Sequence, residues 1–169
     1  NIGDPVKLVC DLYKVFKEES GSNEALDDFY FWGEMLISDF DDADKNMADT
    51  ETLFSNLKDL NDLTDRYEFL EEEQKKALAQ FFANFNIEES TQLKQRFITP
   101  WDVLGKVYSK YKSLLKSQSI AYEGMMYREV TENFNIDQLP YSKYVFVGFN
   151  VLNKVEHTLF EKLNKAGKA

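Results

Sequence analysis

Four aspartates gather between residues 39 and 46, a spacing that could bind a divalent cation. Carboxylate oxygens one or two residues apart are the ligands that calcium takes from an EF-hand loop. A loop starting at Asp42 would place Asp44 at its third position. It would also place Met47 where glycine is needed and Leu53 where a bidentate glutamate is needed. Because the pattern fails at its two most demanding positions, we interpret this cluster as a solvated acidic turn.

Other residue types with catalytic chemistry are scarce in the chain. His157 is the one histidine and Cys10 the one cysteine. One histidine does not supply the paired Glu-x-x-His motifs of a di-iron site, and one cysteine builds neither a zinc cluster nor an internal disulfide. The sequence also lacks Gly-x-x-x-x-Gly-Lys and Gly-x-Gly-x-x-Gly phosphate loops. We therefore expect no catalytic residue, no metal and no cofactor here, with His157 a partly exposed helical side chain and Cys10 a core residue.

Charge is distributed unevenly along the chain. The net charge is −10, but residues 1–89 hold 8 basic and 23 acidic residues, a balance of −15, while residues 90–169 hold 12 and 7, a balance of +5. A basic half can lie beside a polyanion such as DNA, or beside the acidic half of its own chain. Charge alone does not choose between these two arrangements.

Composition favours a folded, non-membrane chain. Of the 169 residues, 43% are hydrophobic and 15% aromatic, which is too apolar for disorder and enough for one domain with a core. No window approaches the roughly 18 to 20 apolar residues of a membrane span. A lone cysteine suits a reducing compartment. These features predict a cytoplasmic protein without membrane contact.

Hydrophobic residues recur at helical spacing over the first 90 residues. The pattern predicts a helix from Pro5 to about Ser20 and a second from Leu26 to near Phe40, with the remaining acids in a turn. Two shorter helices are expected around residues 53–60 and 78–85. The aromatic side chains on these stripes, together with Trp101, Tyr108 and Tyr111 in the second half, are expected to form the core rather than a surface for stacking bases.

Further helices are expected in the second half. Residues 91–118 predict a long helix that restarts or kinks near Thr99-Pro100, since proline lacks a backbone donor and favours the first turn of a helix. Residues 121–134 predict another helix, and residues 135–142 a connector. We therefore expect residues 1–140 to form a helical domain.

The last part of the chain has a different pattern. Residues 144–149 form an almost unbroken apolar run, which is typical of a strand covered on both faces, and residues 151–163 have helical spacing. A single strand leaves its backbone groups unpaired unless a sheet accepts it. The fold class is therefore mainly α, a multi-helix domain followed by a strand-helix unit at residues 141–169 that we interpret as part of a truncated α/β core. In isolation the strand should pack against the helices or pair with a second copy.

Two stretches, residues 29–45 and 144–160, resemble the helicase-like region of AddB-type and related PD-(D/E)XK nuclease proteins of Bacteroides-like bacteria. Proteins of that family process double-strand DNA breaks. The resemblance implies a helical subdomain inserted in a superfamily 1 helicase-like core, followed by the strand that returns to the core. It also implies a parent chain with an ATP-dependent helicase or nuclease character and a partner helicase subunit.

The resemblance also bears on ATP hydrolysis at the returning strand. In active superfamily 1 motors this strand ends in an aspartate that holds Mg²⁺ and a glutamate that orients water. Val147 and Gly148 stand at those positions here. Neither side chain binds a cation or accepts a proton, so the resemblance implies a degenerate ATPase site. The segment itself is then not an enzyme.

The function implied is a non-catalytic helical fragment of a helicase-nuclease that scaffolds or guides DNA during double-strand-break repair. Basic residues of the second half are the candidates for sequence-independent phosphate contacts. These candidates are Lys94, Arg96, Lys106, Lys110, Lys112 and Lys116. The alternative, motivated by the charge of −15 in the first half and the aromatic content, is an acidic helical module that binds a protein and never meets nucleic acid.

Overall fold

The computed structural model describes residues 1–54 and 91–169, with side chains described in residues 1–54 and 103–169. The helices, in chain order, are α1 (Pro5–Ser20), α2 (Leu26–Lys45), α5 (Thr91–Ser117), α6 (Glu123–Asn133) and α7 (Lys154–Lys165), with the short 3-10 helix η2 (Ile136–Gln138) after α6. Residues 50–54 are also helical. In the described part of the chain the sole β pairing is an isolated bridge between Ile2 and Ala121. The prediction of a mainly α fold is confirmed.

Helix α1 begins and ends as its sequence predicts. The Asp4 side chain accepts a hydrogen bond from the Lys7 backbone N–H at 3.1 Å, and Pro5 occupies the first turn, where its missing N–H costs nothing. At the other end Gly21 takes a left-handed φ of 66° and donates its N–H to the Lys17 carbonyl. Local capping therefore defines where this helix begins and ends.

Helix α2 is longer than predicted. It continues past Phe40 to Lys45, so the acidic residues 39–45 are helical rather than part of a turn. Acids at a helix C-terminus oppose the helix dipole, which is the reason an earlier end was expected. The dipole effect is worth about 1 kcal/mol at most at an exposed site. Contacts of Asp41 and Asp44 with other helices, described below, outweigh it.

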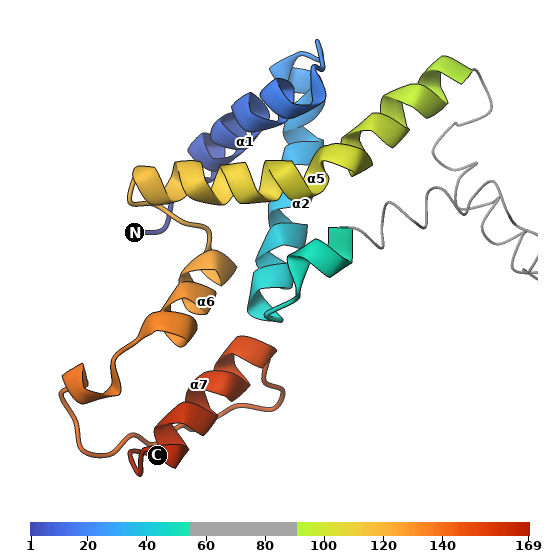
Figure 1. Cartoon of the computed structure of the whole chain (residues 1–169). Coiled ribbons are helices and arrows are strands. Elements are labelled where there is room, and N and C mark those ends of the chain that lie inside the picture. Colours follow the sequence, from blue (N-terminus) through green and yellow to red (C-terminus); the bar gives the residue numbers. More distant parts are fainter. Residues whose placement is uncertain (55–90) are drawn as a thin grey trace, which may run out of the picture.

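The predictions for α5 and for the third helix are confirmed in part. Helix α5 runs without interruption through Pro100, so the predicted restart at residues 99–100 does not occur as a break in the helix. Figure 1 shows the other predicted outcome: α5 changes direction along its length, as expected where proline removes a backbone donor. Residues 50–54 confirm the start of the short third helix. Its remainder, and the helix predicted at residues 78–85, lie outside the described residues.

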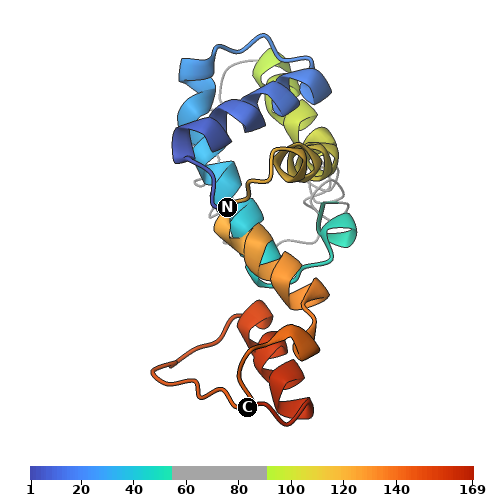
Figure 2. The same cartoon turned by 90° about the vertical axis from the view of Figure 1, so that its left-hand side faces the viewer.

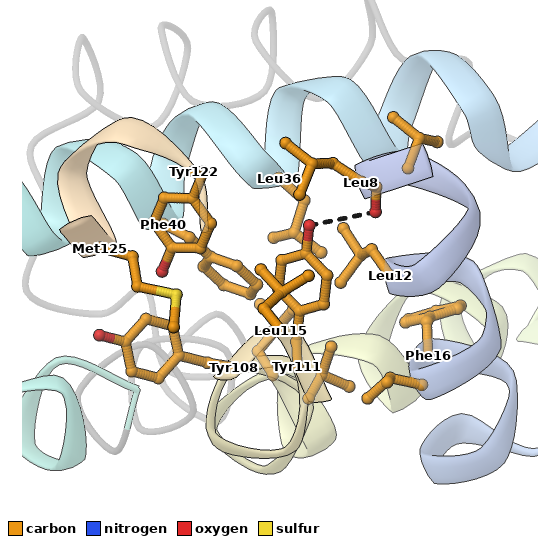
Figure 3. Packing of buried hydrophobic residues seen from close by; sticks show 14 of the residues in the cluster. Leu8, Leu12, Phe16, Leu36, Phe40, Tyr108, Tyr111, Leu115, Tyr122 and Met125 are labelled. Atoms are coloured by element: carbon orange, nitrogen blue, oxygen red, sulfur yellow. Dashed lines mark hydrogen bonds between the residues drawn. The ribbon is translucent and has the colours of Figure 1, made fainter. Parts of the chain in front are cut away.

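The hydrophobic core lies where α1, α2 and α5 meet (Figures 1 and 3). Leu12, Phe29, Phe40 and Tyr111 are almost completely buried in it. The Tyr111 hydroxyl donates a hydrogen bond to the Leu8 carbonyl at 3.1 Å, drawn as a dashed line in Figure 3. This bond satisfies a buried polar group and joins α5 to α1. The prediction that these aromatic stripes form core is confirmed for Phe29 and Tyr111.

Residues 144–150 do not form the predicted strand. They have no regular secondary structure, and Gly148 takes a φ of 90°, which interrupts an extended conformation. The physical reason is the absence of a neighbouring strand among the described residues to accept their backbone hydrogen bonds. The segment packs against α7 instead: Phe146 stacks on Phe160 with ring centroids 4.0 Å apart. Packing on a helix was one of the two outcomes expected for an isolated strand.

Helix α7 confirms the predicted final helix. Asn153 and Glu156 form a reciprocal capping box at its start. In Figure 2 this helix and the segment before it lie at the end of the molecule opposite α1. Contacts with α6 and α2 attach it to the rest, and Lys162 Nζ donates to the Thr131 carbonyl at 2.5 Å.

Glycine is required where α6 meets α2. A Cβ added to Gly124 would lie 2.3 Å from the Asp41 carbonyl oxygen, a backbone atom that cannot rotate away. We expect Gly124→Ala to force the two helices apart and to lower the free energy of unfolding by about 1 to 3 kcal/mol. Urea denaturation followed by circular dichroism measures this.

Gly105 provides the matched control, because it lies inside α5 and a Cβ there would only touch Phe54 at 3.4 Å. Replacing an interior helical glycine by alanine favours the helix by about 1 kcal/mol, so Gly105→Ala should be neutral or stabilising. Equal loss of stability in both variants would contradict the close approach at Gly124.

Candidate functional site

A buried carboxylate stands at the centre of the polar contacts between helices. Asp44, near the end of α2, is completely buried. Its Oδ1 accepts hydrogen bonds from the Tyr108 hydroxyl at 2.6 Å and from Lys112 Nζ at 2.8 Å. Its Oδ2 accepts from the Tyr122 hydroxyl at 2.5 Å and from Lys112 Nζ at 3.0 Å. One side chain of α2 thus holds two residues of α5 and the residue that precedes α6.

Arg128 of α6 completes this cluster. Its Nη1 lies 3.4 Å from Asp44 Oδ1 and donates to the Ala48 carbonyl at 3.0 Å, while its Nε donates to Glu132 at 2.8 Å. The positive charges of Lys112 and Arg128 therefore balance the negative charges of Asp44 and Glu132. A buried charge is tolerated when it is both paired and hydrogen-bonded, and Asp44 meets both conditions.

The electrostatics of the cluster disfavour catalysis. Burial, together with the hydrogen bond to the carboxylate of Asp44, raises the pKa values of Tyr108 and Tyr122. Both hydroxyls therefore stay protonated and donate to Asp44. All four side chains that surround the carboxylate are donors that already use it as their acceptor, so the arrangement acts as a cross-link between helices rather than as a general base.

Asp41 makes a second contact from the end of α2. Its Oδ1 accepts the Gly124 backbone N–H at 2.5 Å, in the first turn of α6, where unpaired N–H groups and the helix dipole favour a negative charge. Lys45 bridges Asp41 at 2.7 Å and Glu123 at 2.6 Å. The acidic end of α2 is thus a docking point for α6.

A second buried carboxylate lies in α1. Asp11 accepts from Lys7 at 2.6 Å and from Lys14 at 2.9 Å. Burial alone would raise its pKa, but hydrogen bonds from Lys7, Lys14 and Gln118 outweigh burial and hold the pKa of Asp11 below its ordinary value. Hydrogen bonds from Lys45 and from Lys116 similarly lower the pKa values of Glu123 and Glu129.

The six basic residues expected to touch DNA lie on α5, and they differ in surroundings. Lys94 and Arg96 belong to the part of α5 whose side chains are not described. Lys106 is exposed. The other three pair with acids of three different helices: Lys110 with Glu19 of α1, Lys112 with Asp44 of α2, and Lys116 with Glu129 of α6 at 2.5 Å.

These pairs answer the question that charge alone left open. Within the described residues, Lys110 and Lys112 of the basic half pair with acids of the acidic half, whereas Lys116 pairs with an acid of its own half. Lys112 in particular keeps only 19% of its side chain exposed and serves Asp44. Lys112 therefore has an internal partner in place of a phosphate.

The positions expected to mark a degenerate ATPase lie on the surface. Val147 is 83% exposed, and Gly148 is exposed beside it in the segment that packs on α7. His157 is exposed on α7, and Cys10 is partly buried on α1. No group of three or more His, Cys, Asp or Glu side chains suited to a metal ion occurs among the described residues. No helix in the described ranges is long and apolar enough to cross a membrane.

Sequence reasoning missed the role of Asp44, although a signal was present. The buried stripe of α2 runs through Phe29, Gly33, Leu36 and Phe40 in steps of three or four residues. The next step is Asp44. An acid on the core stripe of a helix must find donors from its neighbours, and the Tyr108 and Lys112 pair one turn apart supplies them.

Comparison with models of protein families, with curated proteins and with solved structures finds no match to this chain. The family that the resemblance implies therefore stays a prediction.

Asp44→Ala should be strongly destabilising, because it leaves Lys112 and the two tyrosine hydroxyls without their acceptor. We expect the free energy of unfolding to fall by about 3 kcal/mol or more. Asp42→Ala is the matched control, since Asp42 is an exposed acid on the same helix, and such changes stay within about 0.5 kcal/mol. Urea denaturation measures both; similar losses would show that Asp44 has no special role.

The lowered pKa values predict acid sensitivity. A carboxyl group whose pKa in the folded state lies below its ordinary value stabilises the protein at pH values above that ordinary value. This contribution is lost as the pH falls through the pKa of the folded state. The ordinary values are 3.8 for Asp11 and 4.5 for Glu123 and Glu129. Stability should therefore fall from about pH 5 toward pH 3. We expect Asp11→Asn to reduce this loss of stability at low pH, whereas the exposed control Asp27→Asn should not. The urea concentration at the midpoint of unfolding, measured at several pH values, tests this.

Proposed function

We propose that this chain is a non-catalytic helical module that binds a protein partner through its acidic outer surface. The observation that supports the proposal is the internal pairing of the basic residues on α5. Lys110, Lys112 and Lys116 pair with acids of their own fold, and the chain as a whole carries a net charge of −10. Such a surface repels phosphate groups and attracts basic groups.

Large exposed apolar side chains also favour a protein partner. The segment that packs on α7 exposes Val145, Val147 and Val151 by 86%, 83% and 86% of their surfaces. Single exposed apolar residues are ordinary, but several in one short segment suit contact with another protein surface. The buried carboxylate cluster, in which the Tyr108, Lys112 and Tyr122 side chains all donate to Asp44, supports a scaffold rather than an active site.

A second candidate function is the DNA-guiding insert of a helicase-nuclease that the resemblance implies. The observation that favours it is the same exposed segment, residues 144–151. In a longer chain this segment would become a strand of the motor core, and Val147 and Gly148 would leave that core without its ATPase acids. Phosphate contacts would then come from exposed cations such as Lys106.

One experiment separates the two candidates. The chain is titrated with labelled single- and double-stranded DNA from about 20 to 200 mM salt, where phosphate contacts change affinity steeply. In parallel, a tagged chain is purified from its own cells, and any co-purified protein is prepared separately and recombined with it. We expect no saturable DNA binding and a recombined complex of fixed stoichiometry by isothermal titration calorimetry.

The opposite result would favour the second candidate. Saturable DNA binding that weakens with salt and is reduced in Lys106→Glu would contradict the protein-binding proposal. Lys106 is the appropriate residue to change because it is exposed. Changing Lys112 would confuse a lost DNA contact with a lost partner of Asp44.

A further inference from the structure

The solvent-facing side of α2 carries two large apolar side chains. Phe31 is 72% exposed and Met35 is 50% exposed. Residues four apart lie one above the other on a helix, so the two side chains are neighbours on one face. The buried residues Phe29, Leu36 and Phe40 lie on the opposite face of the same helix. Phe31 and Met35 are therefore presented outward by a helix whose other side is fixed in the core.

Acidic residues surround this apolar pair. Helical geometry places Asp27 and Glu34 on one side of Phe31 and Asp28 and Asp39 on the far side of Met35. All four acids are exposed, and Asp42 lies one turn beyond. Within the described residues these five acids form no ion pair, and the sole cation of α2 is Lys45 at its end. We name Phe31, Met35 and these five acids the outer face of α2.

The electrostatics of this face are unbalanced. Burial and the neighbouring charge of Asp42 raise the pKa of Asp39, so the negative charge of Asp42 disfavours ionisation of Asp39. Acids facing outward at the end of α2 also oppose the helix dipole. By contrast, Asp41 and Asp44 on the inner side have cationic partners. A cationic ligand would relieve this repulsion, whereas an anionic one would increase it.

Resting on the proposed function, we infer that the outer face of α2 binds a positively charged amphipathic helix of the partner protein. The apolar residues of that helix contact Phe31 and Met35, and its lysines or arginines reach the surrounding acids. A central apolar contact surrounded by charge is the usual arrangement of a protein interface. The patch is one helix face wide, which matches a helix better than a broad surface.

The other occupants fit less well. A second copy of this chain would bring two acidic rims together, and like charges facing each other cost several kcal/mol. A nucleic acid or an anionic membrane would be repelled by the same rim. The single occupant that matches both the apolar centre and the charge is a basic, apolar protein segment.

The test uses the full chain and a synthetic helical peptide of about five turns, leucine on one face and lysine on the other. Its counterpart carries glutamate in place of lysine. Binding is measured by isothermal titration calorimetry. We expect the lysine peptide to bind, the glutamate peptide not to bind, and Phe31→Ser with Met35→Ser to weaken binding by about tenfold or more, as for central interface residues.

Two further variants serve as controls. Val6→Ser with Val130→Ser removes exposed apolar surface on α1 and α6 and should leave the affinity unchanged. Asp28→Asn with Asp39→Asn should weaken binding and reduce its dependence on salt. Hydrogen exchange of the wild-type chain with the peptide bound should show protection within residues 27–42, a readout that needs no variant.

Four results would overturn the inference. Unchanged affinity after the Phe31 and Met35 substitutions would mean that the peptide binds by charge alone. Protection outside α2 would place the contact elsewhere. A dimer of the free chain that dissociates in Phe31→Ser with Met35→Ser would make a second copy the occupant. A recombined natural complex that tolerates these substitutions would refute this face and leave the proposed function standing.

Discussion

The arrangement of the described helices depends on the buried carboxylate of Asp44. Burying a charge costs several kcal/mol unless opposite charge and hydrogen bonds surround it. Asp44 is completely buried, and Tyr108 and Lys112 of α5, Tyr122 before α6 and Arg128 of α6 all donate to it or lie close to it. These donors come from residues more than 60 positions away in the sequence. The requirement to satisfy one acid therefore fixes how α5 and α6 meet α2.

Ion pairs connect α5 to three other helices of the described part of the chain. The acidic first half and the basic second half are complementary: α5 pairs with acids of α1 and α2 from the first half, and also with an acid of α6 from its own half. The two pairs with solvent-exposed lysines, Lys110–Glu19 and Lys116–Glu129, contribute about 1 kcal/mol or less each, so their effect is to set orientation more than to supply stability. What stays outside is an excess of acid and, on α2, a pair of apolar side chains. The internal pairing of these cations thus helps to set the charge of the surface that the described helices expose.

Helices were easier to predict than their ends or their neighbours. The stripes of α1 and α2 and the caps of α1 are local features, and the helices form where those features predict them. The end of α2 was misplaced, because the favourable contacts of Asp41 and Asp44 involve residues of α6 and α5 that local pattern does not include. The strand at residues 144–150 was predicted from composition. A strand needs a partner strand, and the described residues offer none, so the same apolar side chains pack against Phe160 instead.

The sequence by itself determined the mainly α class, the separation of charge between the halves and the absence of phosphate-loop and zinc-cluster motifs, since each is a property of composition or short-range spacing. The tertiary structure decided which acids are buried, which lysines have partners and which apolar residues face solvent. Asp42 and Asp44 are two residues apart and chemically identical, yet one is exposed and the other completely buried. The difference is the side of α2 on which each lies, and only the packing of α5 and α6 against that helix makes one side the interior.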